Sequence, residues 1–291
     1  MRTLILLTII WTQSLAQIEN IGDQIKKEKI KEHIMVLASD SLGGREVGQP
    51  GEFMAAEYMS NYFKQLGIPP YKDSTYYQKI PLEKRTIENA SIYIEDIKYE
   101  YKKDFYTYPS FSSIDVKSKE IVFLGYGIDT EKYSDYNIDV KDKVIMIFQG
   151  EPKDRNGNHL VSGGKENSPE SNWKFKLNIA RSKGVKAVLF ITEDYDLGYK
   201  KVEHKIEHPG VSLVQKEEPT PFFYISKKIA KKILGGSQIE RLKNKIKSKK
   251  RPQTKLFNKS VRLFTENKDI SFSGNNVLGF IEGTDPKLKN E

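Results

Sequence analysis

Cysteine is absent from the sequence, and no apolar run is long enough to span a bilayer. Without cysteine the chain forms no disulfide and has no thiol for a lipid anchor. A membrane-spanning helix needs about 20 consecutive apolar residues, and no segment reaches this length. Stability must therefore come from an ordinary packed core. The composition, 37% hydrophobic and 30% charged, predicts such a core inside a soluble surface.

The first sixteen residues predict a signal peptide for export. Arg2 supplies the positive start, Leu4 to Trp11 form a short apolar run, and Ser14-Leu15-Ala16 is a small-x-small cleavage site. A buried N-terminal helix is the alternative, but no amphipathic period runs through the segment. Export without disulfides favours a bacterial periplasm or exterior, with no membrane anchor.

Positive charge is concentrated late in the chain. The net charge is +9, and fourteen Lys or Arg but only one acid, Glu240, lie between Lys227 and Arg262. This run could bind an anionic polymer or could be the solvated face of amphipathic helices. Apolar residues recur behind the lysines, and only Phe257 could stack on bases. We favour a solvated face and expect no nucleic acid partner.

The N-terminal part is predicted to be helical. Apolar residues at i, i+4 and i+7 predict a helix over Lys26 to Ala38, and a glycine-rich loop follows from Ser39 to Gly51. A second helix is expected from about Glu52 to Leu66. It should end at Gly67, since Pro69 and Pro70 stop it.

From Tyr76 onward the pattern favours strands. Short apolar runs predict buried strands, with a helix capped at Ser168-Pro169 between them. The polar stretches 151–170 and 194–219 are interpreted as surface loops. The last expected strands are Val261 to Thr265 and Val277 to Ile281. The interpretation is an α+β chain in which residues 85–256 interrupt a domain made of 17–84 and 257–291. A single mixed α+β domain is the alternative.

Two segments resemble the two-zinc aminopeptidases of metallopeptidase family 28. The first runs from Leu37 to Gly51 and continues through a helix ending in Phe63-Lys64-Gln65-Leu66-Gly67. It is similar to the pattern L-x-S-D-x-x-x-G-R-x-x-G-x-x-G, and its motif residues are Asp40, Gly44, Arg45, Gly48 and Gly51. Closely spaced glycines permit positive φ angles, and Asp40 and Arg45 could tie the loop by a hydrogen bond. The second is Asn276-Val277-Leu278-Gly279-Phe280-Ile281-Glu282-Gly283-Thr284-Asp285-Pro286, which resembles N-V-x-G-x-x-x-G-x-D-P.

A third segment resembles the protease-associated domain that is often inserted in these peptidases. It contains Gly125-Tyr126-Gly127, then Ser134-Asp135-Tyr136, then Lys141-Asp142-Lys143 before a buried strand. Asp142 stands where the family usually has glycine, and aspartate tolerates turn conformations. The resemblance implies an α/β, mixed-sheet peptidase domain interrupted by a β-rich protease-associated domain at 85–256.

The resemblance also implies a reaction. The family removes N-terminal residues from peptides with two zinc ions that share a water, and a carboxylate acts as general base. In the family the ligands follow the segment that ends this sequence. No residue here matches a catalytic or metal position, so we expect no zinc bound to this chain alone.

The four histidines are the remaining candidates for a metal site. His33 is expected to be a structural or surface residue, and His159 is expected to be solvated in its loop. His204 and His208 formally match H-x-x-E-H, a zinc-peptidase motif that requires a helix. Because Pro209-Gly210 follows directly, we expect at most adventitious metal binding there.

Three functions compete at this point. The leading hypothesis is the N-terminal portion of an exported zinc aminopeptidase that acts on peptides, a portion that is inactive by itself. A non-catalytic module that binds peptides or proteins through the protease-associated domain is the first alternative. A binder of anionic polymers, using the basic run, is the second. The sequence does not specify the oligomeric state.

Overall fold

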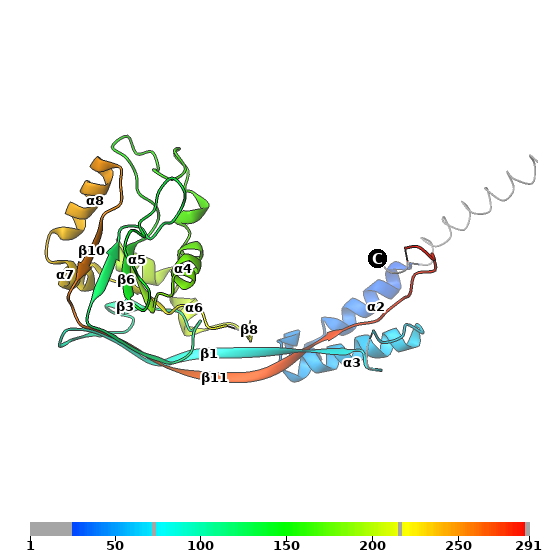
Figure 1. Ribbon diagram of the computed structural model, residues 1–291. Coiled ribbons are helices and arrows are strands. Elements are labelled where there is room, and N and C mark those ends of the chain that lie inside the picture. The colour runs from blue at the N-terminus through cyan, green and yellow to red at the C-terminus, as the bar shows by residue number, and fades with distance from the viewer. Residues whose placement is uncertain (1–24, 72–73, 215–216, 289–291) are drawn as a thin grey trace, which may run out of the picture. The chain divides into compact units, whose positions relative to one another are not determined.

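The computed structural model describes residues 25–71, 74–214 and 217–288. The chain is an α+β protein that divides into two compact units (Figure 1). Unit 1 comprises residues up to Leu82 and residues from Phe272 onward, and unit 2 runs from Glu83 to Ser271. The predicted signal peptide lies outside the described residues. Among the described helices, none combines the length and apolarity needed to cross a membrane.

Unit 1 contains the two helices that the sequence predicts. Helix α2 spans Lys27–Leu37 and α3 spans Pro50–Gln65, with the short 3-10 helix η1, Asp40–Arg45, between them. Proline at the first position of α3 fits the helix start, where no N–H is required. The apolar stripe of α2 is largely open to solvent, since Ile30 is 50% and Ile34 is 58% exposed.

The predicted strand from Val277 to Ile281 is wrong. Strand β11 is a single long element, Val261–Val277, and no strand follows it in the described residues. Beyond it the backbone lies along the Pro69-Pro70 segment, where the N–H of Phe280 donates to the carbonyl of Pro69. Because proline has no N–H to return, this pairing cannot grow into a ladder. Ile281 is 75% exposed, so this segment is poorly covered.

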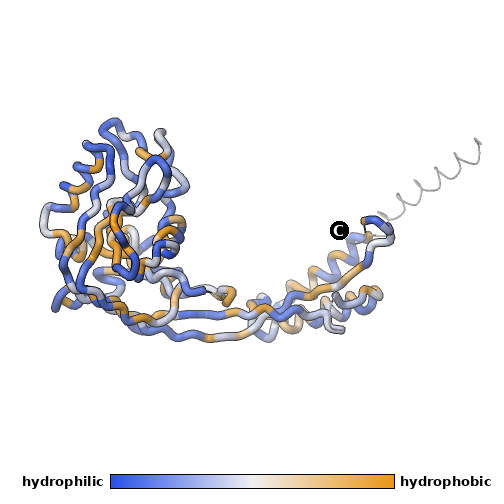
Figure 2. Tube along the Cα trace, viewed as in Figure 1, coloured by the Kyte–Doolittle hydropathy of each residue, from blue (hydrophilic) through white to orange (hydrophobic). Residues whose placement is uncertain are grey.

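The core of unit 2 is a six-stranded sheet in the order β10-β5-β6-β7-β9-β3. Its four central strands are parallel, and both edge strands are antiparallel to them. Every residue of the central strands is buried, as expected for parallel strands covered on both faces. Hydrophobic residues are accordingly concentrated in these strands (Figure 2). The strands are β3 (Phe105–Tyr106), β5 (Ile121–Leu124), β6 (Val144–Phe148), β7 (Ala187–Ile191), β9 (Phe222–Ile225) and β10 (Thr254–Phe257).

Helices cover both faces of this sheet, with α4 on one side and α7 and α8 on the other (Figure 1). Helix α4 spans Trp173–Ser182 and is capped by the side chain of Asn172, so it begins later than the predicted start. Ser168 is an N-cap as predicted, with Pro169 in the first helical position, but of a shorter helix that precedes α4. This is the 3-10 helix η2, Pro169–Ser171. The basic helices are α7, Lys227–Leu234, and α8, Gln238–Lys249.

The stretch 194–219 is more ordered than the predicted loop. Short helices α5, Tyr195–Lys200, and α6, Glu203–Glu207, precede the two-residue strand β8, Ser212–Leu213. Asp194 caps α5 through its side chain. These elements are too short to give the periodic pattern that sequence reasoning needs.

A second sheet has the order β2-β1-β11-β4, with β8 also paired to β1. Its strands are β1 (Tyr77–Ile94), β2 (Ile97–Glu100), β4 (Ile114–Ser118) and β11, and the unit boundary falls within β1 and β11. Within unit 2, Arg85 of β1 donates two hydrogen bonds to the carboxylate of Asp269 on β11. Bidentate pairs of this kind fix the register of neighbouring strands.

The basic run is partly neutralised by acids from other elements of unit 2. The ammonium nitrogen of Lys228 lies 2.9 Å from a carboxylate oxygen of Asp104, and that of Lys232 lies 3.1 Å from one of Glu95. Half of the fourteen cations make such pairs: Lys227, Lys228, Lys232, Lys243, Lys250, Lys259 and Arg262. The apolar side of α7 is buried in the core. The run therefore forms amphipathic helices; the absence of a nucleic acid partner stays a prediction.

Candidate functional site

The glycine-rich loop of unit 1 is built by close packing. A Cβ on Gly51 would lie 1.8 Å from the carbonyl oxygen of Leu42, and one on Gly48 would lie 2.4 Å from the ring of Phe272. Gly44 and Gly48 have φ angles of +76° and +79°, which a side chain rarely permits. Glycine is thus required at these positions by backbone geometry or by space.

The two charged residues of the motif do not tie the loop together. Asp40 begins η1 and Arg45 ends it, and both side chains are exposed. The structure shows no hydrogen bond or ion pair between them, so the expected Asp40–Arg45 bond is wrong. Arg45 has a φ of 58°, which turns its side chain into solvent after the left-handed Gly43 and Gly44.

The histidines differ in their surroundings. His33 lies 2.6 Å from the hydroxyl of Tyr58 and packs on Tyr62, which confirms its structural role. His204 lies within α6 and His208 is its C-cap, with ring centroids 4.9 Å apart. Glu207, between them, accepts a hydrogen bond from Lys102. The glutamate is therefore already engaged.

No zinc site can be assembled from the residues that the structure describes. They include no group of three or more His, Cys, Asp or Glu side chains placed to hold a metal ion. A catalytic zinc requires three protein ligands. The donor set therefore does not fit the metal that the resemblance implies, and no step of a zinc reaction is derived from this chain.

Buried polar side chains gather instead at the carboxyl ends of the parallel strands of unit 2. The carboxyl-end network consists of Asp135, Glu151, His159, Ser168 and Lys176, each at most 6% exposed. Loops that follow the carboxyl ends of parallel strands meet at one edge of a sheet, where open α/β sheets bind ligands.

Asp135 holds the turn that follows β5. Its carboxylate accepts hydrogen bonds from the N–H groups of Tyr126 and Ile128 and from the hydroxyl of Tyr133. Gly125 makes room for it, because a Cβ there would lie 2.6 Å from the carboxylate. Burial raises the pKa of Asp135 to about 7, although these three donors act in the opposite direction.

Lys176 holds the turn that follows β6. From the middle of α4, its ammonium group donates to the carbonyls of Phe148, at 3.1 Å, and Gly150. Burial lowers the pKa of Lys176 to about 7, while the negative charges of Asp135 and Glu151 oppose this shift. A lysine buried so completely is rare unless its donors are satisfied.

Glu151 holds the long loop between β6 and α4. Its carboxylate accepts hydrogen bonds from the hydroxyl and the N–H of Ser168, and Nδ1 of His159 lies 2.7 Å from it. His159 is only 3% exposed, so the prediction that it is solvated is wrong. The physical reason is non-local: the loop folds back on Glu151, which brings the ring into the interior.

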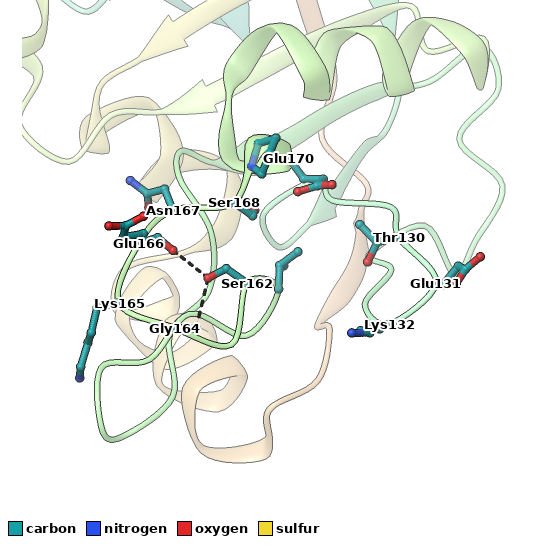
Figure 3. A pocket seen from close by; sticks show the side chains of 12 residues that line it. Thr130, Glu131, Lys132, Ser162, Gly164, Lys165, Glu166, Asn167, Ser168 and Glu170 are labelled. Carbon is teal, nitrogen blue, oxygen red and sulfur yellow. Dashed lines mark hydrogen bonds between the residues drawn. The ribbon is translucent and has the colours of Figure 1, made fainter.

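Two pockets open beside this network. The loop pocket, about 870 Å³, lies between residues 130–132 and residues 161–170 (Figure 3). Its lining is mostly exposed loop, and Ser168 is the only buried polar residue in it. The carboxyl-end pocket, about 600 Å³, is lined by the ends of β5 and β6, by His159 and by α8. Glu151 and His159 of the carboxyl-end network line it, and Asp135 and Lys176 hold the backbone of its lining residues Tyr126 and Gly150, so it is the better-built candidate site.

Sequence reasoning missed this site. Asp135 belongs to the family-like segment Ser134-Asp135-Tyr136, and no sequence pattern marks Glu151. One signal was available for Lys176, which stands three residues after Trp173 and four before Ala180 on the inner face of α4. A lysine on the inner face of a helix indicates a buried polar network.

No protein-family model and no curated protein matches this sequence. Solved structures are similar to it over most of its length. An aminopeptidase from Aneurinibacillus sp. strain AM-1 is 15% identical, with 90% of this chain and 50% of that chain covered and a TM-score of 0.40. A peptidase M28 precursor from Shewanella amazonensis SB2B is 11% identical, covering 88% and 54%, with a TM-score of 0.32. A zinc aminopeptidase from Bacillus subtilis is 13% identical, covering 87% and 46%, with a TM-score of 0.28. The chain spans about half the length of these structures.

Proposed function

We propose that the chain is part of an exported, zinc-dependent aminopeptidase that removes N-terminal residues from peptides. In this proposal unit 1 contributes the first elements of the peptidase domain, and residues 85–256 form an inserted protease-associated domain. In this proposal the described residues of the chain do not supply the zinc ligands. Zinc would lower the pKa of a bound water and polarise the peptide carbonyl.

One observation carries the proposal: the two family-like segments at opposite ends of the sequence lie together in unit 1. Gly279 packs against Phe63 and Ile68, where a Cβ would lie 2.7 Å from a methyl carbon of Ile68. The N–H of Phe280 donates to the carbonyl of Pro69 at 2.9 Å. The third segment falls within unit 2. This arrangement supports a peptidase domain that is interrupted by an insertion.

Glycines of both family-like segments allow close packing of neighbouring elements within unit 1. Gly51 and Gly279 each occupy a place where a side chain would collide with a neighbouring element. Glu52 of α3 accepts a hydrogen bond from the N–H of Asn275 at 2.9 Å. The helix, the loop and the last strand therefore form one closely packed assembly, as the start of a catalytic domain requires.

The gene product of the source organism provides the test. An epitope inserted between Gly210 and Val211, where a Cβ on Gly210 would meet no atom within 4 Å, allows native purification. The purified protein should contain about two zinc ions per molecule. It should release p-nitroaniline from leucine p-nitroanilide and not from the N-acetylated substrate, which lacks the free amine. A mock purification from the untagged strain controls for contaminating peptidases.

A product that lacks both zinc and activity would refute the proposal. A purified product without zinc, inactive on a panel of aminoacyl p-nitroanilides with and without added zinc, would favour a non-catalytic role. Intact-mass measurement of the same sample identifies the length of the chain tested.

A further inference from the structure

The carboxyl-end pocket has a floor that is fixed before any ligand arrives. Asp135 holds the backbone of Tyr126, Lys176 holds the carbonyl of Gly150, and Glu151 lines the pocket itself beside His159. Three buried ionisable groups thus fix consecutive loops at one edge of an otherwise apolar sheet. Burying such groups is costly, and a satisfied network of this kind rigidifies the backbone that it holds.

The walls of the pocket carry both signs of charge. Three acidic and three basic side chains line it: Glu151, Glu193, Glu240, Lys153, Lys243 and Lys247. Glu151 is satisfied within the network, and Glu193 is paired with Lys227 and Lys243. Among the described residues, Glu240 has no cationic partner, and Lys153 and Lys247 have no anionic one. A ligand that satisfies these groups must carry an ammonium group and a carboxylate.

The spacing of the unpaired groups sets the length of that ligand. Glu240 and Lys247 are seven residues apart on α8, which at about 1.5 Å per residue separates their backbones by roughly 10 Å. An extended peptide spans about 3.3–3.6 Å per residue, so about three residues cover this distance. The amide side chains of Gln149, Asn167 and Asn244 also line the pocket and can bond a peptide backbone.

We propose that the carboxyl-end pocket binds a short peptide of about three residues with both termini free, its ammonium group at Glu240 and its carboxylate at Lys247. Lys153 also lines the pocket and adds a positive charge. A volume of about 600 Å³ is within the range of small-molecule sites. The proposal does not depend on the aminopeptidase assignment.

Calorimetry on the complete 291-residue chain tests the proposal with trialanine, N-acetyl-trialanine and trialanine amide as probes. Trialanine should bind, and either blocked peptide should bind about two- to fivefold more weakly, the effect of losing one exposed ion pair. Dialanine, which is too short to reach both groups, should also bind more weakly than trialanine.

Matched variants assign each terminus. In Glu240→Gln, acetylation of the peptide should cause no further loss, and in Lys247→Gln, amidation should cause none. Lys245→Gln removes an exposed cation of the same helix that does not line the pocket, and it should bind as the wild type does. All three positions are exposed, so each variant should fold, which circular dichroism checks.

Two results would overturn the proposal. The first is the absence of trialanine binding at millimolar concentration in the wild type. The second is binding that depends on Lys245 as much as on Lys247, or on neither terminus of the peptide. Because the readout is binding to this chain, either result would leave the aminopeptidase proposal untouched.

Discussion

Substituting Gly51 by alanine should destabilise unit 1 more than a glycine-to-alanine substitution at any other position of its glycine-rich loop. Gly51 is buried at the start of α3, and the new Cβ would lie 1.8 Å from the carbonyl oxygen of Leu42. Real Cβ atoms essentially never approach closer than 3.0 Å, so the helix and the loop must separate. The obstacle is backbone, which cannot rotate away as a side chain does.

The expected magnitude follows from two opposing effects. Forcing an extra methyl group into a packed site costs about 1–3 kcal/mol, and a backbone obstacle favours the upper end. Alanine gains up to about 1 kcal/mol over glycine within a helix. The net loss should therefore be about 2 kcal/mol in the free energy of opening α3.

Alanine substitutions at two other glycines distinguish the effect of a steric collision from the effect of backbone strain. Gly44 has a φ of +76° with open space around it, so Gly44→Ala should cost about 1 kcal/mol from the left-handed backbone alone. Gly164, in unit 2, has neither feature, and Gly164→Ala should leave α3 unchanged. The expected order of destabilisation is Gly51, then Gly44, then Gly164.

Amide hydrogen exchange, followed by mass spectrometry of peptides from α3, measures this free energy directly. Exchange in α3 should be about 30-fold faster in Gly51→Ala and about fivefold faster in Gly44→Ala, since about 1.4 kcal/mol is a factor of ten. If α3 exchanges no faster in Gly51→Ala than in Gly44→Ala, the collision is relieved at negligible cost and the reasoning is wrong.

Further predictions concern the buried carboxylate and the metal. Burial raises the pKa of Asp135 from 3.8 to about 7, so the folded chain retains a proton that the unfolded chain releases, and stability should fall by up to about 4 kcal/mol as pH rises from about 4 to 7. Asp135→Asn should abolish this component in urea titrations, whereas Asp139→Asn, at an exposed position, should keep it. The 291-residue chain should neither retain stoichiometric zinc after dialysis nor hydrolyse aminoacyl p-nitroanilides, because its described residues hold no three-ligand group. Retained zinc would contradict this, and its loss in a His204→Ala, His208→Ala double variant would assign it to that pair.

Local sequence patterns were sufficient to predict the helices and strands that depend on a few consecutive residues. The i, i+4, i+7 stripe predicted α2, and the apolar runs predicted the parallel strands β5, β6 and β7. An amphipathic helix gives a periodic pattern of apolar residues, and a fully buried strand gives a continuous apolar run, and both are visible within a short stretch of sequence. The assignment of residues 85–256 to a protease-associated domain stays a prediction.

The sequence by itself determined the fold class, the main helices and buried strands, and the positions where closely spaced glycines are required. Only the tertiary structure decided that His159 is buried, that Lys176 and Asp135 hold loops at one sheet edge, and that β11 stops at Val277. These outcomes depend on partners that are distant along the chain. A buried charge is tolerated only where such partners satisfy it, and no local pattern of residues encodes which ones will meet.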